Sequence, residues 1–216
     1  MIRTLLVFSF ILHQNLVLSQ SRGCVTNIAA LTDTVACGES LFLQQVGVGG
    51  TSSDDFSGST LSGLWDNVTN GYVLGGPCGT NPTGGPVLWF ANGSATPRVA
   101  TTKPVDASCG GNICFDFRME TQGGINGCDG PDLANEGVYL EFKTATTPWT
   151  QIYYFSPIGF PYTGWQNHCF PIPLAAQTTL TQFRWSQTNT SGPRYDFWGI
   201  DNINIAIRTG ETLGLV

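Results

Sequence analysis

The chain has 216 residues, a formal net charge of −6 at pH 7 and charged residues at only 11% of its positions. Lys and Arg form no cluster along the sequence, which argues against nucleic acid or an anionic membrane surface as a partner. Gly, Thr, Asn and aromatic residues are abundant, and no run of about 18 apolar residues follows the N-terminal segment. We therefore expect one soluble, β-rich domain without membrane insertion.

The N-terminal segment has the pattern of a secretion signal. Met1-Ile2-Arg3 is a short basic start, residues 5–12 are apolar, and Val17-Leu18-Ser19 suits cleavage after Ser19. We predict that residues 1–19 are a signal peptide and that the mature protein is secreted. The alternative is an uncleaved membrane anchor, but the apolar run is short for a span and is interrupted by polar residues.

The rest of the chain divides into an entry segment with a Gly- and Ser-rich linker at 20–53, a compact domain at 54–207 and a tail at 208–216. In the domain, apolar residues such as Phe115 and Phe117 alternate with polar ones, as in strands with one face on a core. Clusters of Gly, Pro, Asn and Asp separate these strands as turns. The predicted strands lie at 86–90, 112–120, 137–143, 150–155, 181–187 and 197–207. With no long helical period, the pattern indicates an all-β fold, an antiparallel two-sheet jelly-roll sandwich.

All seven cysteines lie after the predicted signal peptide. In an oxidising compartment they are expected to form disulfides, and zinc binding is disfavoured because no Cys-x-x-Cys occurs and His168 is the single histidine of the mature chain. From spacing we predict two disulfides, Cys109–Cys114 and Cys24–Cys37. One of the remaining three (Cys78, Cys128 and Cys169) would then be left over.

Three Asn-x-Ser/Thr triplets begin at Asn67, Asn92 and Asn189. They predict N-glycosylation in a host that glycosylates secreted proteins, and each marks an exposed turn if it is used.

Several segments, taken in order, resemble the subrepeat of the reelin family. The resemblance runs from Asp54 to about Ile207, and its most specific part is Phe-Arg-Trp-x-Gln followed by Trp-x-Ile-Asp-Asn. It implies a jelly-roll domain with a structural calcium ion, acting in extracellular assembly and ligand recognition. The chain departs from reelin in having one subrepeat, and no residue matches the lysines of reelin's receptor site. The matching segments are Asp54-Asp55-Phe56, Trp65, Cys78-Gly79, residues 86–90, 98–102, 136–142, Trp149, residues 183–187 and 198–202.

Calcium needs six to eight oxygen ligands, and a jelly roll brings its first and last strands side by side. We therefore predict a Ca²⁺ site formed by Asp54 and Asp55 on the first strand with Asp201 and Asn202 on the last. The alternative is that these residues serve a turn and a bulge. A second acidic segment, residues 128–136, is interpreted as an acidic turn held by Cys128, with cation binding by its carboxylates as the weaker alternative.

The sequence predicts no enzyme. It has no Gly-x-Ser-x-Gly elbow, no His-Glu-x-x-His and no phosphate-binding Gly-x-x-x-x-Gly-Lys. We predict a non-catalytic extracellular interaction or adhesion module that binds an extracellular protein or glycan. The alternative is a carbohydrate-binding module of a secreted glycan-processing system, which an exposed row of coplanar aromatic rings on one sheet face would favour.

Overall fold

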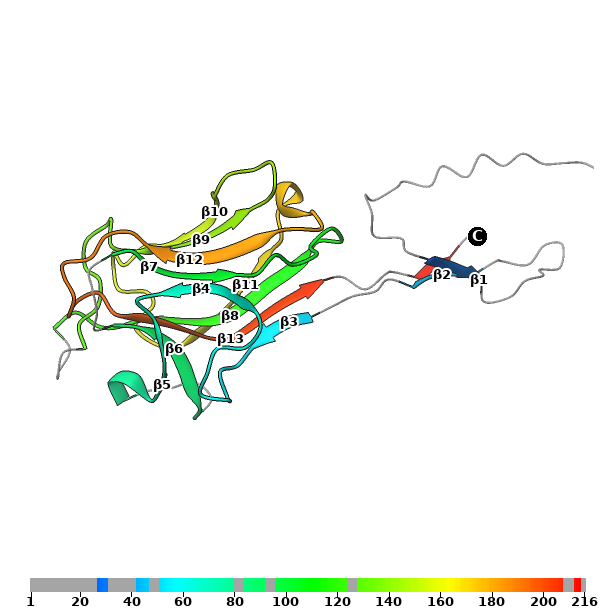
Figure 1. The fold of residues 1–216 in the computed structure, drawn as a ribbon. Coiled ribbons are helices and arrows are strands. Elements are labelled where there is room, and N and C mark those ends of the chain that lie inside the picture. Colours follow the sequence, from blue (N-terminus) through cyan, green and yellow to red (C-terminus); the bar gives the residue numbers. More distant parts are fainter. Residues whose placement is uncertain are drawn as a thin grey trace, which may run out of the picture.

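The computed structural model describes residues 27–30, 42–46, 51–79, 84–91, 96–123, 128–207 and 212–214, which form strands joined by turns (Figure 1). The all-β class that the alternation predicts is confirmed. In the described part of the chain, no helix has the length and apolar character that a membrane span requires. The strands are β1 (Asn27–Ala30), β2 (Phe42–Val46), β3 (Thr51–Asp54), β4 (Trp65–Thr69), β5 (Tyr72–Gly75), β6 (Pro86–Phe90), β7 (Arg98–Thr102), β8 (Gly111–Met119), β9 (Val138–Lys143), β10 (Thr150–Phe155), β11 (Gln166–Pro171), β12 (Gln182–Gln187), β13 (Trp198–Ile207) and β14 (Thr212–Gly214), with the short 3-10 helices η1 (Pro77–Gly79) and η3 (Leu174–Ala176).

Two antiparallel sheets face each other and make the predicted jelly-roll sandwich (Figure 1). One sheet has five strands in the order β10-β9-β12-β7-β4. The other has the order β11-β8-β13-β6-β5, with β3 also paired to β13. Among the loops by which the chain crosses between the sheets are the one after β8 and the one after β12. Since β8 ends opposite the start of β13, and β9 starts opposite the end of β12, these two crossing loops lie at the same end of the sandwich.

The core between the sheets is built from the alternating apolar residues of both. Phe115 on β8 makes an edge contact with Trp185 on β12, with ring centroids 5.0 Å apart, so the two sheets interdigitate through aromatic rings. Burying such side chains contributes roughly 1.5–3 kcal/mol each. The predicted interior is confirmed, because all eight predicted residues are buried in one cluster: Ile113, Phe115, Phe117, Val138, Leu140, Phe142, Phe183 and Trp185.

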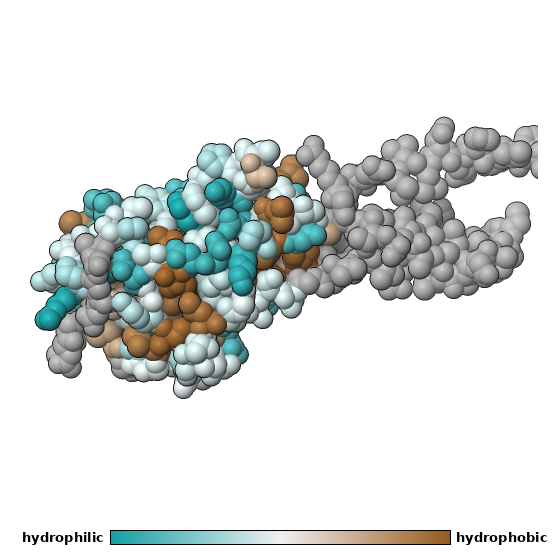
Figure 2. Space-filling view, viewed as in Figure 1, coloured by the Kyte–Doolittle hydropathy of each residue, from teal (hydrophilic) through white to brown (hydrophobic). Residues whose placement is uncertain are grey.

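The sandwich has an apolar edge between β4 and β5, the last strands of the two sheets. Val68 and Val73 are partly buried there and pack against the core. Figure 2 shows hydrophobic side chains gathered between β4 and β6, with hydrophilic side chains above them.

The first and last segments of the domain pair with each other. Asp54 on β3 lies opposite Ile203 on β13, and β3 begins at Thr51. Before β3 and after β13, strands β2 and β14 also pair, with β1 on the other side of β2. The predicted signal peptide at 1–19, together with Cys24, Cys37 and Asn92, lies outside the described residues.

The structure joins Cys114 to Cys169, so the prediction of a Cys109–Cys114 disulfide is wrong. Cys114 on β8 and Cys169 on β11 are directly opposed in register, with Cα atoms 4.1 Å apart. Cys109 precedes β8, and an extended strand carries Cys114 away from it by about 3.3 Å per residue. Cys109 is the free cysteine of the described chain, which also corrects the prediction that one of Cys78, Cys128 and Cys169 would be left over.

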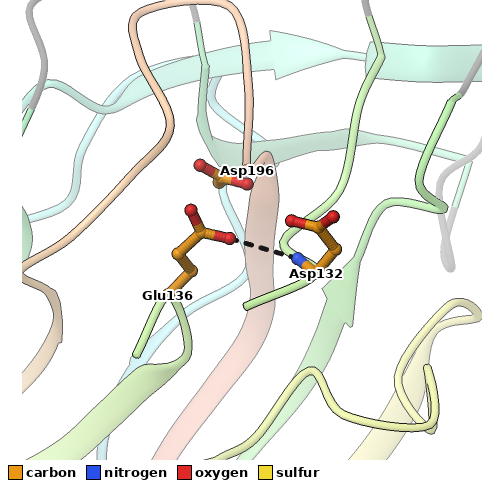
Figure 3. Close-up of side chains that lie close together, drawn as sticks. All are labelled: Asp132, Glu136 and Asp196. Atoms are coloured by element: carbon orange, nitrogen blue, oxygen red, sulfur yellow. Dashed lines mark hydrogen bonds between the residues drawn. The ribbon is translucent and has the colours of Figure 1, made fainter. Parts of the chain in front are cut away.

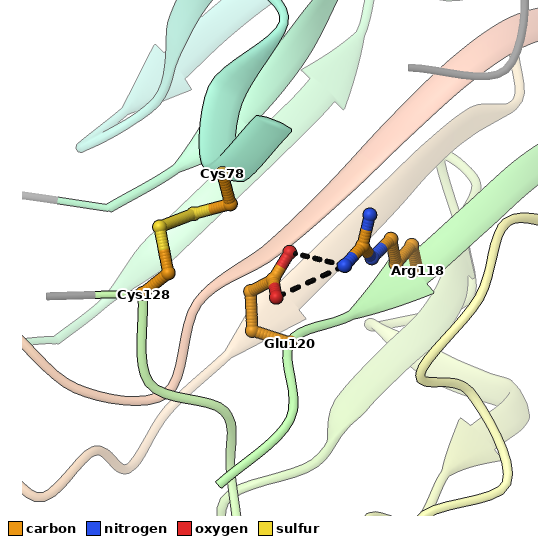
Figure 4. Close-up of a disulfide and its surroundings, with 4 residues drawn as sticks. All are labelled: Cys78, Arg118, Glu120 and Cys128. Atoms are coloured by element: carbon orange, nitrogen blue, oxygen red, sulfur yellow. Dashed lines mark hydrogen bonds and ion pairs between the residues drawn. A yellow bond between two sulfur atoms is a disulfide. The ribbon is translucent and has the colours of Figure 1, made fainter. Parts of the chain in front are cut away.

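The second disulfide, Cys78–Cys128, fastens η1 to the loop that follows β8, with Cα atoms 5.8 Å apart (Figure 4). Beside it lies a buried ion pair, Arg118–Glu120, at 2.8 Å. Burial raises the pKa of Glu120 and the charge of Arg118 opposes that rise. A small apolar cluster around Trp89 lies on this outer face of the six-stranded sheet, with Cys78 packed against it.

Peptide mapping without reduction tests both bridges. We expect one peptide pair that links Cys78 to Cys128 and another that links Cys114 to Cys169, with Cys109 in neither. The matched control is the reduced sample, in which both pairs must disappear. A Cys109–Cys114 peptide in the non-reduced sample would contradict the strand register of β8 and β11.

Candidate cation site

The carboxylate of Asp54, the first residue of the predicted calcium site, is occupied by hydrogen bonds from protein donors. It accepts hydrogen bonds from the backbone N–H groups of Phe56 and Ser62, both at 2.9 Å, and from the indole N–H of Trp65 at 2.7 Å. Only 6% of Asp54 is exposed. Its carboxylate therefore fixes the turn that leads from β3 to β4.

Asp55 is exposed and turns away from the core. Its carboxylate accepts a hydrogen bond from the backbone N–H of Ser57 at 3.0 Å. Hydrogen bonds from Ser57 lower the pKa of Asp55 below its ordinary value. This is the local arrangement of an Asx turn.

Asp201 and Asn202 lie at a bulge of β13 against β8. Asp201 is fully buried and accepts the backbone N–H of Asn202 at 2.8 Å. Asn202 has a φ of 50° and donates its side-chain N–H to Asp116 at 2.7 Å. The structure thus engages these residues in the bulge, and their role in calcium binding stays a prediction.

Three other acidic side chains converge at the end of the sandwich where the two crossing loops meet (Figure 3). Asp132 and Glu136 come from the loop between β8 and β9, and Asp196 comes from the loop between β12 and β13. One carboxylate oxygen of each lies within 4.8 Å of the others. Glu136 and Asp196 are almost fully buried, at 2% and 1% exposed. We call Asp132, Glu136 and Asp196 the acidic cluster.

Backbone and hydroxyl donors hold Glu136 in place. One of its oxygens accepts the backbone N–H of Leu133 at 2.9 Å and that of Asp132 at 3.2 Å, and the other accepts the hydroxyl of Ser191 at 2.6 Å. Burial alone would raise the pKa of Glu136, but the hydrogen bonds from Ser191, Leu133 and Asp132 bring it below its ordinary value. Glu136 is therefore held as a carboxylate.

Asp196 has the opposite balance. Burial, assisted by the nearby charge of Glu136, raises the pKa of Asp196 to about 7, although the backbone N–H of Ser191 and the charge of Arg98 oppose the rise. The pKa of Asp132 is also raised, by desolvation first and then by the charges of Glu136 and Asp129. The cluster thus concentrates negative charge in a partly dry place, where a hard divalent cation would neutralise it.

A buried polar network behind the acidic cluster anchors both loops to the strands. Arg98 on β7 is 1% exposed and donates to the backbone oxygens of Asp196 at 2.6 Å and Tyr195 at 2.9 Å. Gln187 on β12 accepts from Arg98 at 3.0 Å and donates to the backbone oxygen of Glu136 at 2.6 Å. The indole N–H of Trp198 donates to the same Gln187 oxygen at 2.9 Å.

The sequence predicts an acidic turn that contains Asp132 and Glu136, with cation binding as its alternative, but this prediction does not include Asp196. Sixty positions separate Asp196 from Glu136, so no spacing rule joins them. One feature of the sequence does point to Asp196: it directly precedes Phe197 and Trp198, the apolar start of a strand. A carboxylate buried at such a place must find hydrogen-bond donors or a cation.

Comparison with known proteins finds a family model and solved structures that resemble the chain. A family model described as Reelin subrepeat B matches residues 71–206. The structure of CBM35 from Paenibacillus barcinonensis is similar to the chain at 14% sequence identity and a TM-score of 0.40, and the match covers 74% of this chain and 99% of that one.

Proposed function

The chain belongs to the reelin subrepeat B family, whose model matches more than half of its residues, and from this premise we propose that it is a non-catalytic extracellular interaction module. Two disulfides, Cys78–Cys128 and Cys114–Cys169, support an oxidising compartment, where such bridges persist. The two-sheet sandwich supplies the scaffold that holds the surface loops. The family match carries this proposal.

A binding screen of the purified mature chain against arrays of extracellular proteins and of glycans tests it. We expect saturable binding to at least one class of ligand and no turnover of that ligand. Absence of binding on both arrays, or conversion of a bound ligand into product, would overturn the proposal.

We further propose that the acidic cluster binds a structural calcium ion. Two of its carboxylates are buried, and all three converge from loops that the fold brings together. Calcium prefers carboxylate and carbonyl oxygens in an adaptable geometry. The ion would join the loop after β8 to the loop after β12, and it would stabilise the folded state because the unfolded chain has no such group of oxygens.

Melting curves with calcium and with EDTA test the site. A ligand that binds only the folded state stabilises it by about 2.7 kcal/mol when its free concentration is a hundred times Kd. We therefore expect calcium to raise the melting temperature of the native chain. Asp196→Asn should remove most of that rise, because the amide keeps an oxygen but loses the charge that attracts the cation.

Two further variants locate the ion. Asp55→Asn removes an exposed carboxylate outside the acidic cluster and should keep the native calcium response. Asp201→Asn tests the calcium site predicted from the sequence. If the ion lies in the acidic cluster, this variant should also keep the calcium response. Equal melting temperatures of the native chain with calcium and with EDTA would contradict a stabilising ion, and a response lost only in Asp201→Asn would move it to the bulge of β13.

A further inference from the structure

The surface cations of the described chain gather on one side. Six Lys and Arg residues occur in this part of the sequence, and two of them, Arg98 and Arg118, are buried. Of the other four, Lys103, Lys143 and Arg184 belong to neighbouring strands of the five-stranded sheet or follow directly from them. This is unexpected in a protein with a net charge of −6. We call Lys103, Lys143 and Arg184 the basic face.

Strand register sets the spacing of the basic face. Lys143 on β9 lies directly opposite Gln182 on β12. Arg184 on β12 lies opposite Thr101 on β7, so Lys103, two residues further along, comes beside Gln182. The two lysines are therefore about 10 Å apart, since neighbouring strands are separated by about 4.8 Å. Both lysines are exposed, and their backbones lie on either side of Gln182.

Of the two carboxylates at this face, Glu141 and Asp66, Glu141 is already neutralised. Glu141 on β9 accepts two hydrogen bonds from the Arg184 guanidinium, at 2.6 and 3.2 Å, and one from the hydroxyl of Ser186 at 2.8 Å. In the described part of the chain neither Lys103 nor Lys143 has an acidic oxygen within 4.0 Å. Asp66 on β4 accepts a hydrogen bond from Gln182, the residue between the two lysines, at 3.4 Å. The face therefore carries three cations against two carboxylates, and its net charge is positive.

An aromatic ring lies between two of the cations. The Arg184 guanidinium carbon is 4.1 Å from the ring centre of Trp149, and the Lys143 ammonium is 5.9 Å from it. Cation–π contacts of this kind hold the charged groups in place at the surface. On the same sheet, the paired rings of Tyr139 and Tyr154 are tilted by 38° to each other and do not continue a flat row.

We propose that the basic face binds an anionic glycan, a sugar polymer that carries carboxylate or sulfate groups. This rests on the proposed role of the protein as an extracellular interaction module and names its ligand class. Charge complementarity supplies the attraction. Between the two lysines lies the half-buried side chain of Gln182, whose amide oxygen can accept from a sugar hydroxyl. The accessible side chains of the basic face are charged or polar apart from Trp149, which suits a sugar that carries anionic groups. Because the rings make no flat row, neutral polysaccharides should not bind.

Isothermal titration at low salt tests the proposal with four probes: a heparin oligosaccharide for sulfate, an oligogalacturonate for carboxylate, a dextran oligosaccharide as the neutral sugar and oligoglutamate as the acidic peptide. We expect the native chain to bind one or both anionic sugars, with an affinity that falls as salt rises. Lys103→Gln combined with Lys143→Gln should weaken binding about tenfold. Trp149→Leu should weaken it several-fold.

The matched control is Arg194→Gln, which removes an exposed cation beyond the other end of β12 and should leave the affinity unchanged. If Arg194→Gln weakens binding as much as the removal of one lysine of the basic face does, the probes are attracted by the net charge of the protein alone. That result would overturn the proposal. Equal binding of oligoglutamate would overturn the glycan assignment, and so would binding of dextran. If no anionic sugar binds but a protein on the arrays binds saturably, the assignment of the basic face to an anionic glycan is overturned. The proposed function as an interaction module would still stand.

Discussion

Replacing Arg98 with Met is expected to lower the free energy of unfolding by about 3–5 kcal/mol, the range seen when one partner of a buried charged network is removed. The guanidinium donates to the side chain of Gln187 and to the backbone oxygen of Asp196 in buried contacts, and to the backbone oxygen of Tyr195 in a partly buried one. Met fills much of the volume but donates nothing, so the acceptors lose their partner. Each unsatisfied buried group costs about 1–3 kcal/mol.

Urea unfolding followed by tryptophan fluorescence measures this loss through the midpoint and slope of the transition. Arg194→Met is the matched control, because Arg194 is exposed and a surface change of this kind should stay within about 0.5 kcal/mol. We also expect Arg98→Met to reduce the calcium response, since Arg98 fixes the backbone of Asp196. If Arg98→Met lowers the free energy of unfolding by less than about 1 kcal/mol, the hydrogen bonds from β7 do not hold the loop after β12 in place.

The core of this protein follows from its sequence because a strand has a period of two. Ile113, Phe115 and Phe117 could be assigned to one face of β8 without any knowledge of its neighbours, and they are buried together. The same reasoning assigned the partners Val138 and Leu140 on β9. Burial of alternate residues is a local property, and a local pattern reveals it.

Disulfide pairing and the acidic cluster depend on register and topology, which a single sequence does not contain. Cys114 meets Cys169 because β8 and β11 pair in one particular register, whereas spacing along the chain favoured Cys109. Asp196 meets Glu136 because two crossing loops end at the same edge of the sandwich.

The basic face shows the same limit. Lys103, Lys143 and Arg184 are about 40 positions apart in sequence, and only the order β9-β12-β7 makes them neighbours. The sequence shows no basic cluster along the chain, and a cluster formed across strands leaves no pattern in it. Charge on a β-sandwich therefore has to be judged after its strand order is known.

Gly130→Ala is expected to be the most disruptive single-atom change near the acidic cluster. Gly130 lies between Cys128 and Asp132, and its backbone N–H donates to the backbone oxygen of Thr121 at 3.1 Å. A Cβ atom at this position would overlap the backbone carbonyl of Glu120, which cannot rotate away as a side-chain end could. The loop must then move outward. Overpacking of this kind typically costs about 1–3 kcal/mol, and a clash with backbone belongs at the upper end.

The displacement should also reach the cation site, because Asp132 follows Gly130 by two residues and must move with it. We therefore expect Gly130→Ala to lower the urea midpoint and to weaken the calcium-dependent rise in melting temperature, two effects that a change in the core alone would not combine. Gly63→Ala is the matched control: no atom lies within 4 Å of its added Cβ, and reduced freedom of the unfolded chain should leave its stability equal or slightly higher. If Gly130→Ala unfolds like the native chain but loses the calcium response, the loop has room to shift and only the ligand geometry is strict. If it keeps both, the close contact between residues 120 and 130 is absent in solution, and the loop after β8 is not held as the structure places it.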